Sequence, residues 1–252
     1  MGIAISALGI PGMSSPPPKR KPNFLLILAD DMGFSDLGCY GGEIDTPHLD
    51  SLAANGLRFT RFYNCARCCP TRASLITGLY PHQAGVGGMM NKGPTPAYLG
   101  HLNDRCVTIA EVLGRVGYRT YMSGKSHWGE QESAWPSNRG FDHHYGLISG
   151  AMNYFDITKS KSPGLHRIFV RDHQRFTPGG NGFYATQAFT DEAIKYLQQH
   201  KESYKDHPFF LYLSYNAPHY PLQALPKDIS KYRGRYLCGR EEIRRCRQRR
   251  QT

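Results

Sequence analysis

The stretch that decides the fold is Asn23-Phe24-Leu25-Leu26-Ile27-Leu28-Ala29, followed directly by Asp30-Asp31. A continuous apolar run of this kind predicts a strand that is buried on both faces of a parallel sheet. Two adjacent carboxylates at the end of such a strand repel each other unless a cation or hydrogen-bond donors compensate them. A hard cation with oxygen ligands, Ca²⁺ or Mg²⁺, is a natural partner for Asp30 and Asp31. A turn that caps a helix would use aspartates equally well.

Two further predicted strands also end in polar and charged residues. Arg119–Met122 leads into a segment that contains Lys125 and His127, and Pro208–Tyr215 leads into a segment that contains His219. In open α/β sheets, ligands bind beyond the carboxyl ends of the strands. A lone histidine is more often structural than catalytic, but three such clusters at one sheet edge indicate a site. The sequence therefore predicts an α/β fold with a mostly parallel sheet between helices.

The remaining elements follow from periodicity and from helix boundary residues. One helix is predicted to open at Asp45-Thr46-Pro47 and to close at Asn55-Gly56. Two others are predicted at residues 108–117 and 184–200, where apolar side chains recur at helical spacing. The alternating segment 57–63 predicts a strand, and residues 80–98 and 160–182 are predicted to be long surface loops.

A cluster of cysteines precedes another short helix. In Cys68-Cys69-Pro70-Thr71-Arg72, proline is suited to a first helical position, and Gly78 is a plausible helix end. A cysteine just before the start of a helix faces unpaired backbone N–H groups and the positive end of the helix dipole. Arg72 adds a permanent positive charge. This stretch therefore predicts an activated sulfur.

Composition limits the classes of function. The 252 residues carry a formal net charge of +11, but eight arginines against two glutamates lie in the last twenty residues, so nucleic acid is not the expected partner of the body of the chain. The seven cysteines include a Cys65-x-x-Cys68 spacing without a second Cys or His pair, so it does not predict a zinc site. No apolar run is long enough to span a membrane.

The first residues are compatible with two compartments. The weakly apolar segment 3–10 lacks the basic start and the long apolar centre of a secretory signal. The sequence predicts a periplasmic or secreted protein if a signal start was missed, and a cytoplasmic one otherwise. Residues 1–20, which are rich in proline near their end, are predicted to be a flexible lead-in.

The cysteine stretch and its surroundings resemble the sulfatase family, within the alkaline-phosphatase-like superfamily. Cys68-Cys69-Pro70-Thr71-Arg72 with Leu75, Thr77 and Gly78 resembles the sulfatase signature, in which Cys, Pro and Arg occupy alternate positions. Because the pattern needs a cysteine two places before Pro70, Cys68 is the match. The resemblance covers residues 21 to about 235.

The resemblance implies that a formylglycine-generating maturation enzyme oxidises Cys68 to an aldehyde. One hydroxyl of the hydrated aldehyde would attack a sulfate ester, either an aryl or a carbohydrate sulfate. The other hydroxyl would then lose its proton, and the carbon would expel sulfate as the aldehyde re-forms. This is covalent catalysis in which the intermediate resolves itself.

The resemblance also assigns roles to the other candidate residues. Asp30 and Asp31, with residue 68, resemble the ligands of Ca²⁺, which lowers the pKa of the attacking hydroxyl. Arg72 resembles the residue that holds the formylglycine hydrate. Lys125 resembles the sulfate-binding lysine, and His127 a histidine on the hydrate. His219 resembles the histidine at the ester oxygen, which would assist the leaving alcohol. Ser126 stands where the family often has an aromatic residue.

The resemblance weakens after residue 236. We expect 21–236 to be the N-terminal portion of a sulfatase catalytic domain and 237–252 to be an aberrant basic tail, with a nucleic-acid or membrane-surface tail as the alternative. An Asp-Asn or Asp-His pair and a second lysine, which the family supplies later, are expected to be missing, so activity is expected to be impaired. The alternatives to a sulfuric ester hydrolase are a phosphonate monoester or phosphodiester hydrolase and a non-catalytic fragment.

Overall fold

A mixed β-sheet forms the centre of the protein, whose computed structural model describes residues 20–159, 167–180 and 182–251. Its strand order is β1-β6-β2-β3-β4-β5, with β1, β6, β2 and β3 parallel and with β4 and β5 antiparallel to their neighbours. The strands are β1 Phe24–Asp30, β2 Arg119–Gly124, β3 His143–Leu147, β4 Phe169–Arg171, β5 Gln174–Arg175 and β6 Phe209–Pro218. The predicted α/β fold with a mostly parallel sheet is confirmed.

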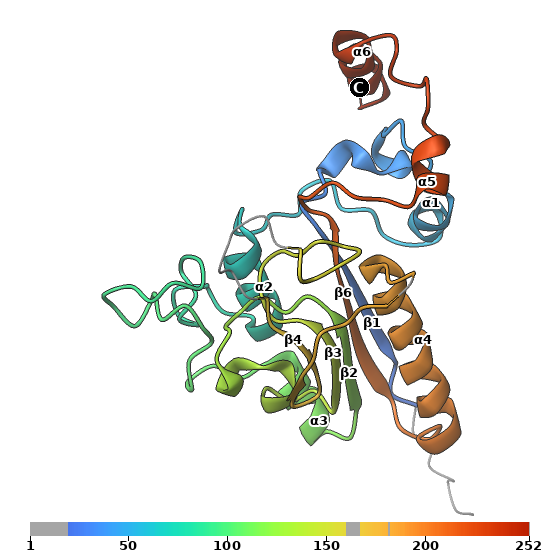
Figure 1. The fold of residues 1–252 in the computed structure, drawn as a ribbon. Coiled ribbons are helices and arrows are strands. Elements are labelled where there is room, and N and C mark those ends of the chain that lie inside the picture. The colour runs from blue at the N-terminus through green and yellow to red at the C-terminus, as the bar shows by residue number, and fades with distance from the viewer. Residues whose placement is uncertain (1–19, 160–166, 181, 252) are drawn as a thin grey trace, which may run out of the picture.

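Helices cover both faces of the sheet (Figure 1). Helix α4, Ala185–Ser203, lies on one face, and α2, Cys68–Thr77, and α3, Ile109–Arg115, lie on the other. Side chains of β6 alternate between the two layers, because successive residues of a strand point to opposite faces. Phe210 and Tyr212 join the apolar core under α2 and α3, whereas Leu211 and Leu213 join the core under α4.

Three further α-helices lie beyond the carboxyl ends of β1 and β6 (Figure 1). They are α1, Pro47–Ala54; α5, Pro226–Ser230; and α6, Arg240–Gln251. The segment predicted to be an aberrant tail thus contains a helix, and that helix contacts the chain that follows β1. In that contact, Arg247 Nη2 lies 2.6 Å from Glu43 Oε2, and Arg247 Nη1 lies 3.0 Å from Asp36 Oδ1.

The predicted helices are confirmed as α1, α3 and α4, with small differences at their ends. Helix α2 begins at Cys68, so Pro70 is its third residue and not its first. Thr108 caps α3 through a reciprocal pair of hydrogen bonds with Glu111, which fixes the start of that helix. In 80–98, the structure contains only one isolated bridge, between Val86 and Tyr98, so the loop prediction is also confirmed.

Two predictions about strands and loops are wrong. Residues 57–63 form no strand, and their side chains are exposed, because the segment pairs with no other strand in the described chain. The predicted loop at 160–182 contains the short hairpin of β4 and β5, since Phe169 and Val170 are buried and extend the sheet. Residues 160–166 and 181 of that segment lie outside the described residues.

The expectation that the first strand is buried on both faces is also wrong. Strand β1 is at the edge of the described sheet, where Leu26 and Leu28 pack on the core while Leu25 and Ile27 are exposed. An apolar run alone cannot distinguish a central strand from an edge strand, because that difference depends on neighbours elsewhere in the chain.

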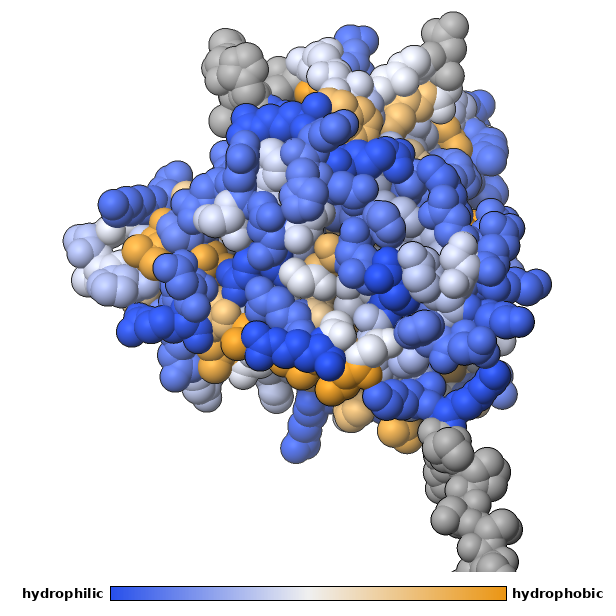
Figure 2. All heavy atoms as spheres, turned by 90° about the horizontal axis from the view of Figure 1, so that it is seen from below, coloured by the Kyte–Doolittle hydropathy of each residue, from blue (hydrophilic) through white to orange (hydrophobic). Residues whose placement is uncertain are grey.

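Apolar side chains of the helical segment around α3 are also more exposed than the sequence predicts. Val112 and Val116, expected on the inner face of that helix, are half exposed. Figure 2 views the molecule from the side on which α3 lies and shows separate apolar patches among mainly hydrophilic side chains. In the described part of the chain, no helix combines the length and apolar character needed to cross a membrane.

A matched pair of leucines tests this arrangement. Leu25 and Leu211 are register partners on β1 and β6, but Leu211 is 1% exposed and Leu25 is 53% exposed. We expect Leu211→Ala to lower the free energy of unfolding by about 2–5 kcal/mol, because it leaves a cavity in the core. Leu25→Ala should lower it by less than about 1 kcal/mol, since little buried area is lost. Urea denaturation of both variants measures the difference, and equal losses would contradict the edge position of β1.

Candidate active site

A buried carboxylate at the end of β1 joins the ends of three elements. Asp30 Oδ1 lies 3.2 Å from Arg72 Nη2 of α2, and Asp30 Oδ2 lies 2.5 Å from Lys125 Nζ, which follows β2. All three side chains are almost fully buried. The juxtaposition follows from the parallel register, which places the carboxyl ends of β1, β6 and β2 at one edge of the sheet.

Strand β6 completes the support of Arg72. Arg72 Nη1 donates to Ser214 Oγ and to the Lys125 backbone carbonyl, the latter at 2.8 Å. Arg72 Nη2 also donates to the Tyr215 carbonyl at 3.4 Å. Because these contacts fix the guanidinium from several sides, Arg72 cannot move far from Asp30.

The almost fully buried charged side chains of the site are two cations and one carboxylate. Arg72 and Lys125 are two buried cationic side chains that share one carboxylate, Asp30. Burial and the neighbouring Arg72 charge lower the pKa of Lys125, whereas Asp30 opposes this shift. A buried charge without a full partner is costly, so this arrangement favours an anionic ligand.

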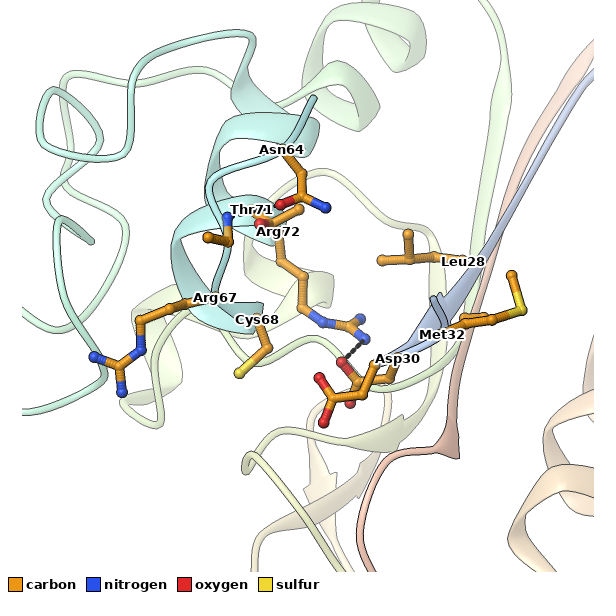
Figure 3. Close-up of a pocket in the computed structure, with 11 residues that line it drawn as sticks. Leu28, Asp30, Met32, Asn64, Arg67, Cys68, Thr71 and Arg72 are labelled. Carbon is orange, nitrogen blue, oxygen red and sulfur yellow. Dashed lines mark hydrogen bonds and ion pairs between the residues drawn. The ribbon is translucent and has the colours of Figure 1, made fainter. Parts of the chain in front are cut away.

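The two adjacent cysteines of α2 have different environments. Cys68, at the first position of the helix, is half buried and lines a hollow of about 220 Å³ together with Asp30, Asp31 and Arg72. Figure 3 shows Arg72 extending from α2 to Asp30, with Cys68 beside them. Cys69 is fully buried, and its Sγ lies 3.1 Å from His127 Nε2. Of the two cysteines, only Cys68 therefore lines the hollow.

The surroundings of the two thiols shift their pKa values in opposite directions. A hydrogen bond from Cys69, together with His127 and Lys125, lowers the pKa of the Cys68 thiol well below its ordinary value. The hydrogen bond to Cys68 and burial raise the pKa of Cys69. Cys68 is therefore the thiolate of the pair, as expected for a cysteine at a helix start near cations.

Two site residues have unusual backbone conformations. Asp31 has φ 64° and His127 has φ 54°, in the left-handed region that non-glycine residues rarely adopt. Such conformations cost about 1–3 kcal/mol each and are concentrated at functional sites. A Cβ at Gly150 would lie 2.5 Å from His127 Nε2, so the imidazole fits only against glycine. Burial lowers the pKa of His127, which is therefore neutral near pH 7.

His219 contacts the second aspartate of the site. Its Nε2 is 3.5 Å from Asp31 Oδ2, and its Nδ1 is 2.5 Å from the Tyr220 carbonyl. The Tyr154 hydroxyl donates to the carbonyls of Asn216 at 2.8 Å and His219 at 2.7 Å, and so fixes the segment that carries the imidazole. His219 is partly exposed at this edge of the site.

Every residue predicted for the site lies in this region, but not every one lines the same hollow. Asp30, Asp31, Cys68 and Arg72 line it; Lys125 is behind Asp30, His127 is behind Cys69, and His219 is beside Asp31. Sequence reasoning missed three supporting residues, Ser214, Tyr154 and Asn216. Only Asn216 had a signal, its position directly after an apolar strand; its amide is buried, with no hydrogen-bond partner in the described chain.

The two aspartates fit a hard divalent cation in ligand type and charge. Asp30 and Asp31 place carboxylates in one hollow, and Asp31 is exposed there. Carboxylate oxygens are the ligands that Ca²⁺ and Mg²⁺ prefer. Two carboxylates offer at most about four of the six to eight oxygens that Ca²⁺ takes, so further ligands would have to come from water or from a bound anion.

The fold and the geometry of the site define an α/β protein of the alkaline-phosphatase-like type, with a cluster of charged side chains at the carboxyl ends of its parallel strands. The chain belongs to the sulfatase family, since the family model described as Sulfatase matches residues 22–251. That match extends through α6, beyond the boundary at residue 236 drawn from the motifs; the division of the chain there stays a prediction.

Relatives of known sequence include several sulfatases. An uncharacterised sulfatase, PB10D8.02c of Schizosaccharomyces pombe, is 38% identical over 240 residues, which is 90% of this chain and 43% of that protein. An arylsulfatase of Klebsiella aerogenes is 34% identical over 250 residues, 97% of this chain and 53% of that protein. The chain thus spans about half the length of these curated relatives.

Solved structures give the same result for the fold. A crystal structure of Ps i-CgsB in complex with k-i-k-neocarrahexaose has a TM-score of 0.72 and 34% identity, over 84% of this chain and 48% of the other. A structure of BT4656 in complex with its substrate D-glucosamine-2-N,6-O-disulfate has a TM-score of 0.66 and 28% identity, over 84% and 37% of the two chains.

The difference between thiols gives a test on the unmodified chain. Iodoacetamide reacts with thiolates, so Cys68 should remain reactive at about pH 6, where a free thiol is largely protonated. Cys39 is a suitable comparison, because it is also half buried and because burial and Asp50 raise the pKa of its thiol. Mass spectrometry of the labelled peptides should show a lower pH midpoint for Cys68 than for Cys39. The same midpoint for both would contradict the assigned charge on Cys68.

Proposed function

We propose that this site hydrolyses sulfate monoesters, aryl or carbohydrate sulfates, with residue 68 as the nucleophile after its conversion to formylglycine. The observation that carries the proposal is the pair of buried cations, Arg72 and Lys125, that contact Asp30 close to Cys68. The sulfatase relatives support the reaction class. Because the chain spans about half of their length, its activity is part of the proposal.

Lys125 would bind the sulfate group, and Arg72 would hold the formylglycine hydrate. Both side chains are almost fully buried, so their charges act in a region of low dielectric constant, where they attract an anion more strongly than in water. Arg72 is fixed by Ser214 and by two backbone carbonyls, and therefore needs no rearrangement when the ester binds. Such fixed donors stabilise the charge that develops in the transition state.

Two groups absent from the described chain would complete the chemistry. Residue 68 as formylglycine, made from Cys68 by a maturation enzyme, would supply a hydrated aldehyde as the nucleophile. Asp30 and Asp31 would hold Ca²⁺ or Mg²⁺, which offsets negative charge on the sulfate oxygens. The Cys68 Sγ lies within 4.8 Å of a ring nitrogen of His127, so the neutral imidazole would be placed to accept a proton from residue 68.

His219 would protonate the leaving alcohol. Its Nε2 lies 3.5 Å from Asp31 Oδ2, and its backbone is fixed by Tyr154. A positioned general acid matters most when the leaving group is a poor one. Lys125 contacts Asp30 and His219 contacts Asp31, which supports separate roles for the two residues, sulfate binding and protonation of the alcohol.

Replacement of each cysteine tests the assignment of residue 68. In a host that makes the maturation enzyme, the wild-type chain should carry the aldehyde at residue 68 by peptide mass spectrometry and hydrolyse para-nitrophenyl sulfate slowly with Ca²⁺. Cys68→Ala should abolish hydrolysis, and Cys69→Ala should retain conversion and part of the activity, because Cys69 is a core residue that does not line the hollow.

Three results would contradict this proposal. Equal loss in both cysteine variants would mean that the sulfur is misassigned. A converted chain without any sulfate ester hydrolysis would favour a non-catalytic fragment. Faster turnover of a matched phosphate diester or phosphonate monoester than of the sulfate would favour a phosphodiester or phosphonate monoester hydrolase.

The role of His219 predicts a dependence on the leaving group. His219→Gln should slow hydrolysis of a carbohydrate sulfate by about 10²–10⁴-fold, the usual contribution of a general acid. The same variant should slow para-nitrophenyl sulfate much less, because nitrophenolate leaves without a proton. Initial rates for both esters give the ratio, and equal slowing would rule out proton donation by His219.

A further inference from the structure

A cluster of soft metal ligands lies beside the carboxylates. The Sγ atoms of Cys68 and Cys69 and one ring nitrogen of His127 all lie within 4.8 Å of one another. We call these three residues the thiol–imidazole cluster. Cys69 Sγ is 3.1 Å from His127 Nε2, and both side chains are buried, while Cys68 is half buried. The cluster therefore has one side toward the protein core and one toward the hollow.

The spacing suits a tetrahedral metal ion. Zinc binds thiolate sulfur at about 2.3 Å and imidazole nitrogen at about 2.0–2.1 Å, so neighbouring ligand atoms lie roughly 3.3–3.8 Å apart. The cluster reaches such distances with side-chain shifts of about 1 Å. His127 is held by its left-handed backbone and by its close fit against Gly150, so the imidazole is already in place.

We propose that the unconverted chain, in which residue 68 is still a cysteine, binds one Zn²⁺ through Cys68, Cys69 and His127. Each sulfur binds as a thiolate, and a proton that it still carries passes to solvent as its bond to zinc forms. The two thiolates balance the charge of the ion, which matters because Arg72 and Lys125 are close by. Three protein ligands leave a fourth position for water, and Cys68 borders the hollow from which water can reach it.

This site is distinct from the one proposed for Ca²⁺ or Mg²⁺. Asp30 and Asp31 offer oxygen ligands, which hard ions prefer, whereas thiolates and imidazole prefer Zn²⁺. It also differs from the Cys65-x-x-Cys68 spacing in the sequence. The Cys65 Sγ contacts Ser74 Oγ at 3.5 Å and does not belong to the cluster.

One consequence rests on the proposed function. Zinc would occupy the sulfur that the maturation enzyme must oxidise, and conversion of residue 68 would in turn remove one of the three ligands. The two states of residue 68 would therefore exclude each other: a zinc-bound thiolate, or an aldehyde with no zinc.

Metal binding by the full 252-residue chain tests the proposal. The chain is made in a host without the maturation enzyme, and mass spectrometry verifies the thiol at residue 68. Titration with Co²⁺ should give a sulfur-to-cobalt charge-transfer band that saturates at one equivalent, and Zn²⁺ should displace the cobalt. Cys68→Ser and His127→Ala should each weaken Zn²⁺ binding by about 100-fold or more against a chromophoric chelator, since loss of even a supporting residue costs 10–100-fold.

Cys65→Ser is the matched control and should bind Zn²⁺ like the wild type. Cys69→Ser should weaken Zn²⁺ binding like the other ligand variants. Because Cys69 is a core residue, circular dichroism verifies that this variant is folded. If it is not folded, the Cys68→Ser variant, at a half-buried position, decides the test. No charge-transfer band, or an equal loss in Cys65→Ser, would overturn the proposal. The zinc titration contains no sulfate ester and is independent of the hydrolysis assay. A chain that binds Zn²⁺ here but hydrolyses no sulfate ester in that other assay would therefore contradict only the proposed function.

Discussion

The structure depends on the contact of one buried carboxylate with two buried cations. Asp30 ends β1, Lys125 follows β2, and Arg72 belongs to α2, so these ion pairs connect two strands and a helix at one edge of the sheet. Removing charges from water costs several kcal/mol per ion unless they are well paired. Here the pairing is incomplete, with two cations for one carboxylate. In the described chain, the two cations therefore share one buried carboxylate at this edge of the sheet.

The two adjacent cysteines have different roles in the structure, one in the core and one at the hollow. Cys69 fills the core and contacts His127, while Cys68 borders the hollow and has a lowered pKa. The helix imposes this division, because consecutive residues of a helix point about 100° apart. A nucleophile or its precursor thus lies directly on a rigid, buried support, as a site with little freedom of movement requires.

Much of this site can be predicted from the sequence, because strand ends are local features. Apolar runs locate β1, β2 and β6, and the polar residues that follow them include Asp30, Lys125 and His219. The contacts among them are not local: Ser214 supports Arg72 from 142 positions away. Likewise, neither the exposure of Leu25 nor the irregular course of residues 57–63 could be predicted, since both depend on which strands pair in space. The hairpin of β4 and β5 is too short to give a periodic signal.

The order of the strands also determines when the site is completed during translation. Strand β6, the last strand of the described chain, lies between β1 and β2, so Arg72 does not have its full set of partners until the chain has reached about residue 215. At about 5–20 residues per second, a ribosome adds the 142 residues between Arg72 and Ser214 in roughly 7–30 s. During that interval the nascent segment around Cys68 lies outside any finished sheet. A modifying enzyme could therefore reach this cysteine during translation, before the strand that completes its surroundings has been made.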